Sequence, residues 1–366
     1  MKFNIAYLPG DGIGPEVASE AVRVLQTVCE KFGHKAILEY GDVGGVSIDR
    51  HGTALTDETL AMCRKSDAVL LGAVGGPKWD DPDSDVRPED GLLALRKGMR
   101  LFANLRPVKV YPMLVDSTNL KPEVVKGVDL MVVRELTGGL YFGKPKKRWR
   151  TEQGRRAVDS MVYTEQEIER IMRVGFEMAR SRRKKLASVD KQNVLMTSRL
   201  WREIAIEMSA EYPDVELEHV LVDACTMRLI QRPAQYDVIV TENTFGDIIT
   251  DEASMLAGSM GMLASASLSG VPKDGARVRG MYEPIHGSAP GRANQNLANP
   301  IATIMSVAMM LRYSLGLPQG ADMVEKAVDD ALADGCRTYD IMSDGMTRVS
   351  TREMGDAILR KVREAA

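Results

Sequence analysis

The chain has 366 residues, of which 44% are hydrophobic and 27% are charged, a composition typical of a globular protein. Its length exceeds what one compact core usually supports, so we expect two domains. The net charge of −3 gives no overall attraction to nucleic acid or to an anionic membrane. The first residues lack the apolar run of a signal peptide, and no apolar stretch is long enough to span a bilayer, which predicts a cytoplasmic protein.

Strand-like segments alternate with amphipathic helical segments along the chain. An apolar strand over residues 3–8 ends at the turn "PGDGIGPE", and Pro15 then suits the first turn of a helix that runs to about Lys31. An amphipathic helix is expected over 165–182. Further strands are expected over residues 67–74, 128–133, 236–241 and 279–285. This alternation predicts an α/β fold with a largely parallel sheet.

The cysteines and histidines are scattered, without the short spacings of a zinc site, so any metal is expected on carboxylates that suit Mg²⁺ or Mn²⁺. In "TENTFGDIITDEAS", Asp247 and Asp251 are four residues apart and would share one face of a helix. Asp223, after a predicted strand, could complete a set of three carboxylates. The alternative is an exposed acidic turn, and this segment alone favours neither interpretation.

Three arginines near predicted turns, Arg96, Arg106 and Arg134, could together bind a dicarboxylic acid through bidentate ion pairs. Tyr141 follows two glycines that would let a ligand approach it, and Lys191 lies beside Asp190 just before a strand-like run. Both are candidates for proton transfer. Taken one at a time, such residues more often pack or lie on the surface.

The glycine-rich "GDGIGPE" does not indicate a Rossmann fold, because it reads GxGxG followed by proline and no acidic residue closes a βαβ unit at the expected distance. A cofactor is therefore expected elsewhere, and the loop 286–300, "HGSAPGRANQNLANP", is the candidate. The basic segment 144–156, "KPKKRWRTEQGRR", could bind nucleic acid, but with no nucleic-acid motif nearby a solvated arm or hairpin is favoured.

Taken together, these motifs resemble the β-decarboxylating dehydrogenases, the family of isocitrate and isopropylmalate dehydrogenases. The resemblance is carried by "GDGIGPE", "GAVGGPKWD", "GLLALRK", "FANLRP", "VRELTGGLYFG", "SVDKQNVL", "TENTFGDIITDEAS", "YEPIHGSAP" and "LANPIATIMS", which occur in the family's order. It runs from Ile5 to the carboxyl-terminal "STREMGDAIL" and so covers essentially the whole chain.

The resemblance implies a two-domain α/β subunit that differs from a Rossmann fold. A discontinuous first domain, which binds the cofactor, would comprise residues 1–101 and 258–366. Residues 102–257 would form the second domain, which carries the dimer contacts, with an intersubunit arm near 141–162. The family also implies a homodimer with shared active sites, in which Lys191 and Asp223 are donated by the partner subunit. Neither nucleic acid nor a membrane is an expected partner.

The resemblance also implies a role in catalysis or binding for each site residue. Arg96, Arg106 and Arg134 would bind the substrate carboxylates, and Asp223, Asp247 and Asp251 would hold Mg²⁺ or Mn²⁺. Lys191 would accept a hydroxyl proton during hydride transfer, and Tyr141 would protonate carbon after loss of CO₂. The cofactor would contact Gly75, Gly76, Pro77, Lys78, Asn193, Arg232, Glu283, His286, Gly287, Ser288, Ala289, Pro290, Gly291, Arg292, Asn299 and Tyr339.

The substrate is expected to be 3-isopropylmalate, oxidised and decarboxylated to 4-methyl-2-oxopentanoate in leucine biosynthesis. Leu92 and Leu93 would face the isopropyl group, with Glu89 nearby and Val194 of the partner subunit completing an apolar wall. Such a wall would leave a third carboxylate unpaired, which disfavours isocitrate. An NADP-dependent isocitrate dehydrogenase and a D-malate or tartrate dehydrogenase are the alternatives within the family, and a nucleic-acid-binding protein is a distant one.

The cofactor loop departs from the family's usual NAD-binding pattern. Gly291 stands where NAD-using members have an aspartate for the ribose 2′-hydroxyl, and Arg292 stands where isoleucine is usual. Arg232 and Tyr339 fall where NADP-using isocitrate dehydrogenases contact the 2′-phosphate, although Ser343 replaces a further arginine of that set. These residues favour NADP over NAD. The alternative is that the arginines are surface residues and NAD is used.

Overall fold

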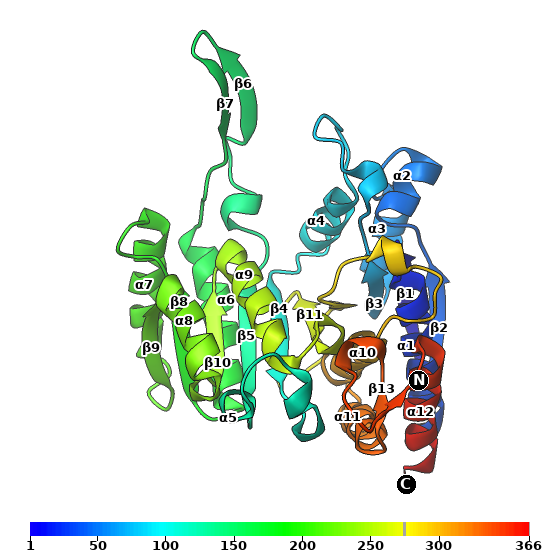
Figure 1. The fold of residues 1–366 in the computed structure, drawn as a ribbon. Helices are drawn as coiled ribbons and strands as arrows, with labels where there is room; N and C mark the ends of the chain where they lie inside the picture. Colours follow the sequence, from blue (N-terminus) through cyan, green and yellow to red (C-terminus); the bar gives the residue numbers. More distant parts are fainter. Residues whose placement is uncertain (274–275, 366) are drawn as a thin grey trace.

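The computed structural model describes residues 1–273 and 276–365, and within them ten strands form one continuous sheet (Figure 1). From edge to edge the strands are β2 (Lys35–Tyr40), β1 (Lys2–Gly10), β3 (Ala68–Ala73), β12 (Gly280–Pro284), β11 (Ala264–Leu268), β4 (Ala103–Lys109), β5 (Asp129–Glu135), β10 (Val238–Thr241), β8 (Lys185–Asp190) and β9 (Glu216–Leu221). Each strand expected from the sequence is present, with its bounds shifted by a few residues.

The sheet is parallel toward both edges and antiparallel at its centre, where β12 pairs with β11, β11 with β4, and β4 with β5. The expectation of a largely parallel sheet is confirmed, although the three central strand pairings are antiparallel. The reason lies in the connections. β11 and β12 are consecutive elements of the described chain, and a parallel pairing would require a helical crossover between them.

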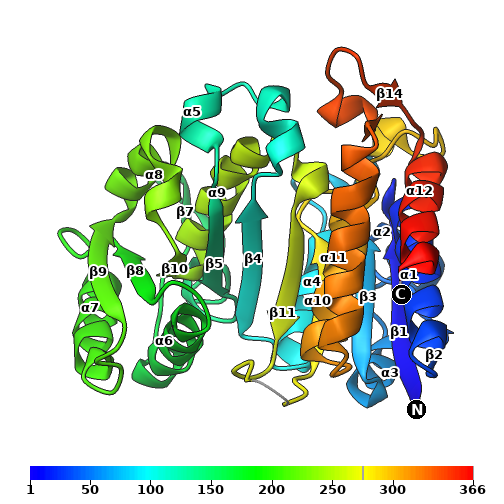
Figure 2. The ribbon, with the colours of Figure 1, turned by 90° about the horizontal axis from the view of Figure 1, so that it is seen from below.

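Helices pack on both halves of the sheet. Around β1, β3 and β12 lie α1 (Gly14–Lys31), α10 (Ile301–Tyr313), α11 (Pro318–Ala333) and α12 (Thr351–Glu364), seen on the right of Figure 2. The other half carries α6 (Glu165–Arg180), α7 (Met196–Ser209), α8 (Val222–Gln231) and α9 (Asn243–Ser254). Shorter helices are α2 (Gly45–His51), α3 (Asp57–Lys65), α4 (Pro88–Gly98) and α5 (Pro122–Val125).

The two helices expected from the sequence are confirmed. α1 begins with proline in its first turn, and α6 begins at a capping box in which Thr164 and Glu167 exchange side-chain and backbone hydrogen bonds. Across the described residues, we find no helix with both the length and the apolar character that crossing a bilayer requires.

One hydrophobic core cluster extends across the sheet and includes Phe3 of β1, Leu105 of β4 and Val240 of β10. Strands β4 and β11 meet where the two predicted domains would adjoin, because β4 belongs to residues 102–257 and β11 to residues 258–366. The sheet therefore continues across that predicted boundary. The division of the chain into those two domains stays a prediction.

The basic segment forms an antiparallel hairpin, β6 (Lys147–Thr151) and β7 (Gly154–Val158), that projects from the rest of the molecule (Figure 1). Most of its side chains are exposed, and Arg148 forms an ion pair of 2.8 Å with Asp83. The favoured interpretation of this segment as a solvated hairpin is confirmed. Its contact with a second subunit stays a prediction.

The turn "GDGIGPE" brings three backbone segments together. The buried carboxylate of Asp11 accepts hydrogen bonds from the backbone N–H groups of Gly45, Val46 and Gly75 at 2.7–2.9 Å. Gly10 and Gly12 have φ values of +71° and +59°, and a Cβ on Gly10 would lie 1.9 Å from the carbonyl oxygen of Ala73. The glycines thus permit close backbone packing, as expected for a turn that is not a nucleotide fingerprint.

We predict that Gly10→Ala lowers the free energy of unfolding by about 3 kcal/mol, because it combines left-handed backbone strain with a clash against fixed backbone. Gly33→Ala is the matched control: its φ is +70°, but nothing lies within 4 Å of the added Cβ, so a loss of only about 1 kcal/mol is expected. Urea denaturation of both variants measures the difference, and equal losses would contradict the importance of the close packing.

Candidate active site

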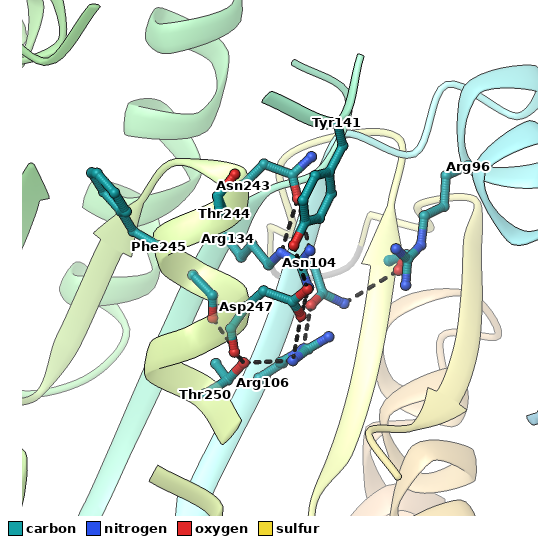
Figure 3. A network of polar contacts seen from close by, with 12 residues as sticks. Arg96, Asn104, Arg106, Arg134, Tyr141, Asn243, Thr244, Phe245, Asp247 and Thr250 are labelled. Carbon is teal, nitrogen blue, oxygen red and sulfur yellow. Dashed lines mark hydrogen bonds and ion pairs between the residues drawn. The ribbon is translucent and has the colours of Figure 1, made fainter. Parts of the chain in front are cut away.

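A cleft of about 410 Å³ opens between the two halves of the sheet. It brings together eleven residues that the sequence analysis singled out: Glu89, Leu92, Leu93, Arg96, Arg106, Arg134, Tyr141, Asp247, Glu283, His286 and Gly287. These side chains come from α4, β4, β5, α9, β12 and the segments beside them, so the site exists only when all these elements pack (Figure 3).

Two of the three arginines are held by neutral oxygen acceptors as well as by one carboxylate. The Arg106 Nε donates to Asn104 Oδ1 at 2.7 Å, and its Nη1 donates to the hydroxyl of Thr250. Arg134 donates from Nε and Nη2 to Asn243 Oδ1 at 3.1 and 2.8 Å. Its Nη1 donates to Asp247. Figure 3 shows these guanidinium groups converging on the Asp247 carboxylate.

The third arginine keeps an unused donor. Arg96 Nη2 forms an ion pair of 3.0 Å with Glu283, while its buried Nε has no hydrogen-bond partner among the described residues. A buried N–H group without a partner is costly unless a ligand or water accepts from it. The Nε–H group of Arg96 is therefore available to donate a hydrogen bond to an acceptor that enters the cleft.

Cationic side chains outnumber carboxylates among the residues that line the cleft. Arg96, Arg106 and Arg134 are 7%, 6% and 1% exposed, and the nearest carboxylates are those of Asp247 and Glu283. Burial, followed by the charge of Arg134, lowers the pKa of Arg106 to about 10. The group remains cationic at neutral pH, although burial and Arg134 destabilise its positive charge. An anionic ligand would compensate it.

Tyr141 lies in the short turn that follows β5, and its hydroxyl donates to Asp247 Oδ2 at 3.0 Å. Burial and then the Asp247 carboxylate raise the pKa of Tyr141 to about 12, so the phenol holds its proton at neutral pH. Although burial opposes ionisation, the nearby Arg134 and Arg106 hold the pKa of Asp247 below its usual value. The pair is thus a protonated phenol beside a carboxylate.

The carboxylates proposed for a metal do not all meet within one chain. Asp247 and Asp251 lie one turn apart on α9, and burial followed by the charge of Asp247 raises the pKa of Asp251. Asp223 lies in the first turn of α8 and pairs with Lys191 at 2.9 Å. Within residues 1–273 and 276–365, no three His, Cys, Asp or Glu side chains are grouped to hold a metal.

The repulsion between Asp247 and Asp251 nevertheless suits a divalent cation, because a cation would favour the charged form of both. Carboxylate oxygens are the ligands that Mg²⁺ and Mn²⁺ prefer. The residues present therefore fit such an ion. The contribution of Asp223 from a partner subunit as a further ligand stays a prediction.

The loop 286–300 is anchored to the first turn of α1 and to α12. Ile13 N donates to Ser288 O at 2.8 Å, and the Glu16 carboxylate accepts from the backbone N–H groups of Asn294 and Asn296. Asn296 in turn accepts from the backbone of Thr351 at the start of α12. Gly12 packs so closely that a Cβ there would lie 2.0 Å from the Ser288 carbonyl oxygen.

Within this loop, Arg292 meets Tyr339, although 47 residues separate them. The guanidinium donates to the Tyr339 hydroxyl and lies over the ring, with 4.6 Å between Cζ and the ring centroid. Gly291 is exposed beside it, with nothing within 4 Å of an added Cβ. Arg232 ends α8 in the other half of the molecule, so one chain does not bring it to this pair (Figure 1).

The remaining expected cofactor residues surround the cleft or lie apart from it. Gly75, Gly76, Pro77 and Lys78 follow β3, and Lys78 pairs with Asp49 at 2.6 Å. Ser288, Ala289 and Pro290 lie in the anchored loop, and the buried Asn299 donates to Asp340 at 3.1 Å. Asn193 and Val194 are exposed on the segment between β8 and α7, outside the cleft.

Sequence reasoning missed several residues that shape the cleft. Asn104, Asn243 and Thr250 orient the arginines, while Lys146 and Ile285 line the cavity. Asn104 and Asn243 stood inside the quoted motifs "FANLRP" and "TENTFGDIITDEAS", so an asparagine in an otherwise apolar strand end or helix start was the available signal. Lys146 carried no such signal, since it stands in a run of cations.

The fold and the cleft together define an α/β protein in which buried arginines line a cleft between two halves of one sheet. The family model described as isocitrate/isopropylmalate dehydrogenase matches residues 4–358. The chain therefore belongs to the isocitrate/isopropylmalate dehydrogenase family.

Its relatives within the family are close in sequence. A 3-isopropylmalate dehydrogenase of Dehalococcoides mccartyi is 63% identical over 361 residues, covering 98% of this chain and 99% of that protein. A 3-isopropylmalate dehydrogenase of Pseudomonas fluorescens is 55% identical over 99% of both chains. The crystal structure of isocitrate dehydrogenase from Methylococcus capsulatus has a TM-score of 0.86 at 34% identity, covering 99% of this chain and 100% of that one.

We predict that Asp247→Asn lowers the pKa of Tyr141 from its value of about 12, because the substitution removes the carboxylate that opposes phenolate formation. The pKa should stay above 10, since burial remains. Titration by NMR of ¹³Cζ-labelled tyrosine, assigned with Tyr141→Phe, measures the change. Asp251→Asn, one turn further along α9, is the control and should shift the pKa less. An unchanged pKa in Asp247→Asn would contradict the coupling.

Proposed function

We propose that the chain catalyses the oxidative decarboxylation of 3-isopropylmalate to 4-methyl-2-oxopentanoate, with hydride transfer to a nicotinamide cofactor, as a step of leucine biosynthesis. The observation that carries this proposal is that three buried arginines and two leucines line one cleft. The 63% identity with a 3-isopropylmalate dehydrogenase over nearly the whole chain supports it.

Substrate recognition divides the cleft into a charged and an apolar part. Arg96, Arg106 and Arg134 bind the two carboxylates of the malate core, and Leu92 and Leu93 of α4 contact the isopropyl group. A third carboxylate at the leucines would be buried without a partner, which disfavours isocitrate. Val194 of the partner subunit extends the apolar wall.

When bound, the nicotinamide accepts the hydride from C2 and the divalent ion polarises the resulting carbonyl, at a site formed by Asp247, Asp251 and Asp223 of the partner subunit. Lys191 of the partner subunit takes the C2 hydroxyl proton. The C–C bond to the β-carboxylate then breaks, CO₂ leaves, and its electron pair forms an enolate. Tyr141, which holds its proton at neutral pH, delivers it to C3.

For the cofactor we favour NADP over NAD. Arg292 lies against Tyr339 at the rim of the loop, and Gly291 removes the aspartate that would repel a 2′-phosphate. The guanidinium and the phenol can both donate to phosphate oxygens. Arg232, on α8, could join them only from a second subunit.

The active enzyme is proposed to be a homodimer. Four apolar side chains in this part of the molecule are 47–58% exposed: Met227 and Ile230 of α8, Ile248 of α9, and Met255, which directly follows α9. Because α8 packs against α9, these side chains belong to one region. An apolar surface of two adjacent helices suits self-association. Such a dimer would bring the Lys191 and Asp223 of one subunit toward the cleft of the other.

The proposed function is tested by initial rates with 3-isopropylmalate and Mg²⁺, using NAD and NADP side by side and isocitrate as the competing substrate. NADP is expected to give the higher kcat/KM. Turnover of isocitrate but not of 3-isopropylmalate would overturn the proposed substrate.

We predict that Arg292→Ile lowers kcat/KM for NADP about tenfold or more, because a hydrogen bond to a charged group contributes about 1.5–3 kcal/mol. The value for NAD should change little. Arg360→Ile, an exposed position on α12, is the control and should leave both values unchanged. Equal losses for NAD and NADP in Arg292→Ile would contradict a 2′-phosphate contact.

Subunit complementation tests the shared site. Lys191→Ala and Tyr141→Phe should each be nearly inactive alone. Unfolding and refolding them together should restore about a quarter of wild-type activity, because half of the dimers are mixed and each mixed dimer carries one intact site. If Lys191 acts within its own chain, each site of a mixed dimer lacks either Lys191 or Tyr141. Mixing the two variants would then restore no activity.

A further inference from the structure

Behind the arginines of the cleft lie three buried polar side chains that carry no charge. Asn104 of β4 is 0% exposed, Asn243 at the start of α9 is 1% exposed, and Thr250 of α9 is 0% exposed. Each presents an oxygen to a guanidinium group, as Figure 3 shows. None of them lines the cavity itself.

Hydrogen bonds on two opposite sides determine the orientation of the Asn104 and Asn243 carboxamides. An arginine can only donate, so the atom facing it must be the amide oxygen. On the opposite side, Asn104 Nδ2 donates to Ser267 Oγ at 3.2 Å, and Asn243 Nδ2 donates to the carbonyl of Gly138 at 3.1 Å. Each asparagine thus connects an arginine to another element: Asn104 to β11 and Asn243 to the turn that carries Tyr141.

The choice of a neutral acceptor matters for the charge of the cleft. A carboxylate at either position would orient its arginine equally well, but it would also cancel the positive charge. Among the described residues, Asp247 at 3.7 Å is the one carboxylate within ion-pair distance of Arg106, and Arg134 shares that same group. Because Asp247 is itself a proposed metal ligand, a bound cation would share the negative charge of this carboxylate with both arginines.

We propose that Asn104 and Asn243 are positioning residues that orient Arg106 and Arg134 through neutral carboxamide oxygens, so that both guanidinium charges stay available to the substrate carboxylates. This inference rests on the proposed function. Asn243 has a second consequence, since it joins Arg134 to the Tyr141 turn and lies one helical turn before Asp247. The substrate-binding arginine and the proton donor are therefore placed relative to each other.

Substitution of Asn104 separates orientation from charge. Asn104→Asp keeps an oxygen for Arg106 and can accept from the Ser267 hydroxyl, but it adds a buried negative charge. We expect KM for 3-isopropylmalate to rise about tenfold or more, while kcat stays within about threefold of wild type. Asn104→Ala removes the acceptor of Arg106 without adding charge. We expect its KM to rise and its kcat to fall, because Arg106 loses its orientation.

The companion variant is Asn243→Ala, which should lower kcat as well as raise KM, because the Tyr141 turn loses its donor. The matched control is Thr244→Val, at the next residue of α9, whose hydroxyl has no hydrogen-bond partner among the described residues and which should retain wild-type constants. Thermal melting of all variants reports stability separately from KM and kcat.

Several outcomes would overturn the inference. One is an unchanged KM in Asn104→Asp and Asn104→Ala, whatever their melting temperatures. Another is a wild-type KM in Asn104→Asp together with a raised KM in Asn104→Ala, which would show that orientation matters and the neutrality of the acceptor does not. If Asn104→Asp does not fold, Asn243→Asp adds the same negative charge beside Arg134, and an unchanged KM there would equally overturn the proposal.

Failure of the proposed function is recognised separately. The wild-type protein is assayed first, and absence of turnover with 3-isopropylmalate would contradict the function rather than the inference. In that case the same variants are compared by calorimetric binding of succinate, a plain dicarboxylate. Weaker succinate binding in Asn104→Asp than in wild type supports the positioning role, and equal binding overturns it.

Discussion

The burial of three arginines in one cleft is the constraint on which the rest of the site depends. A guanidinium removed from water must be hydrogen-bonded, and here the acceptors are two carboxamides, one hydroxyl and two carboxylates. All five of these groups accept hydrogen bonds from the guanidinium groups, but only two of them carry a negative charge against the positive charges of three arginines. Burial and the charge of Arg134 lower the pKa of Arg106, so an anionic ligand such as the proposed dicarboxylate substrate would stabilise its charged form.

The sheet supplies the geometry that this constraint needs. Because β4 pairs antiparallel with both β11 and β5, Arg106 and Arg134 come from neighbouring strands, while α9 lies against them with Asn243, Asp247 and Thr250 on the facing side. The leucines of α4 come from the other half of the sheet. A charged and an apolar lining thus meet in one cleft, and their combination, rather than any single residue, favours isopropylmalate over an acid with a third carboxylate.

In the cofactor loop, the effect of having Gly291 in place of an aspartate depends on the residues around it. Gly291 by itself only removes an acidic group. Because the loop is anchored to α1 and α12, Arg292 reaches Tyr339, and a guanidinium and a phenol come to lie side by side where the aspartate is missing. Their proximity supports the proposed preference for NADP. The turn "GDGIGPE", which resembles a nucleotide fingerprint, packs against this loop at Ser288.

Much of this protein could be predicted from its sequence, because the relevant signals are local or carried by family motifs. Capping and periodicity predicted α1 and α6, the spacing of Asp247 and Asp251 predicted one helix face, and the basic segment predicted a hairpin. The motifs also identified most residues of the cleft. Only the tertiary structure decided three features: the antiparallel centre of the sheet, the hydrogen-bond partners of Asn104 and Asn243, and the contact between Arg292 and Tyr339. They depend on which distant segments pack together, and neither a helical period nor a strand alternation contains that information.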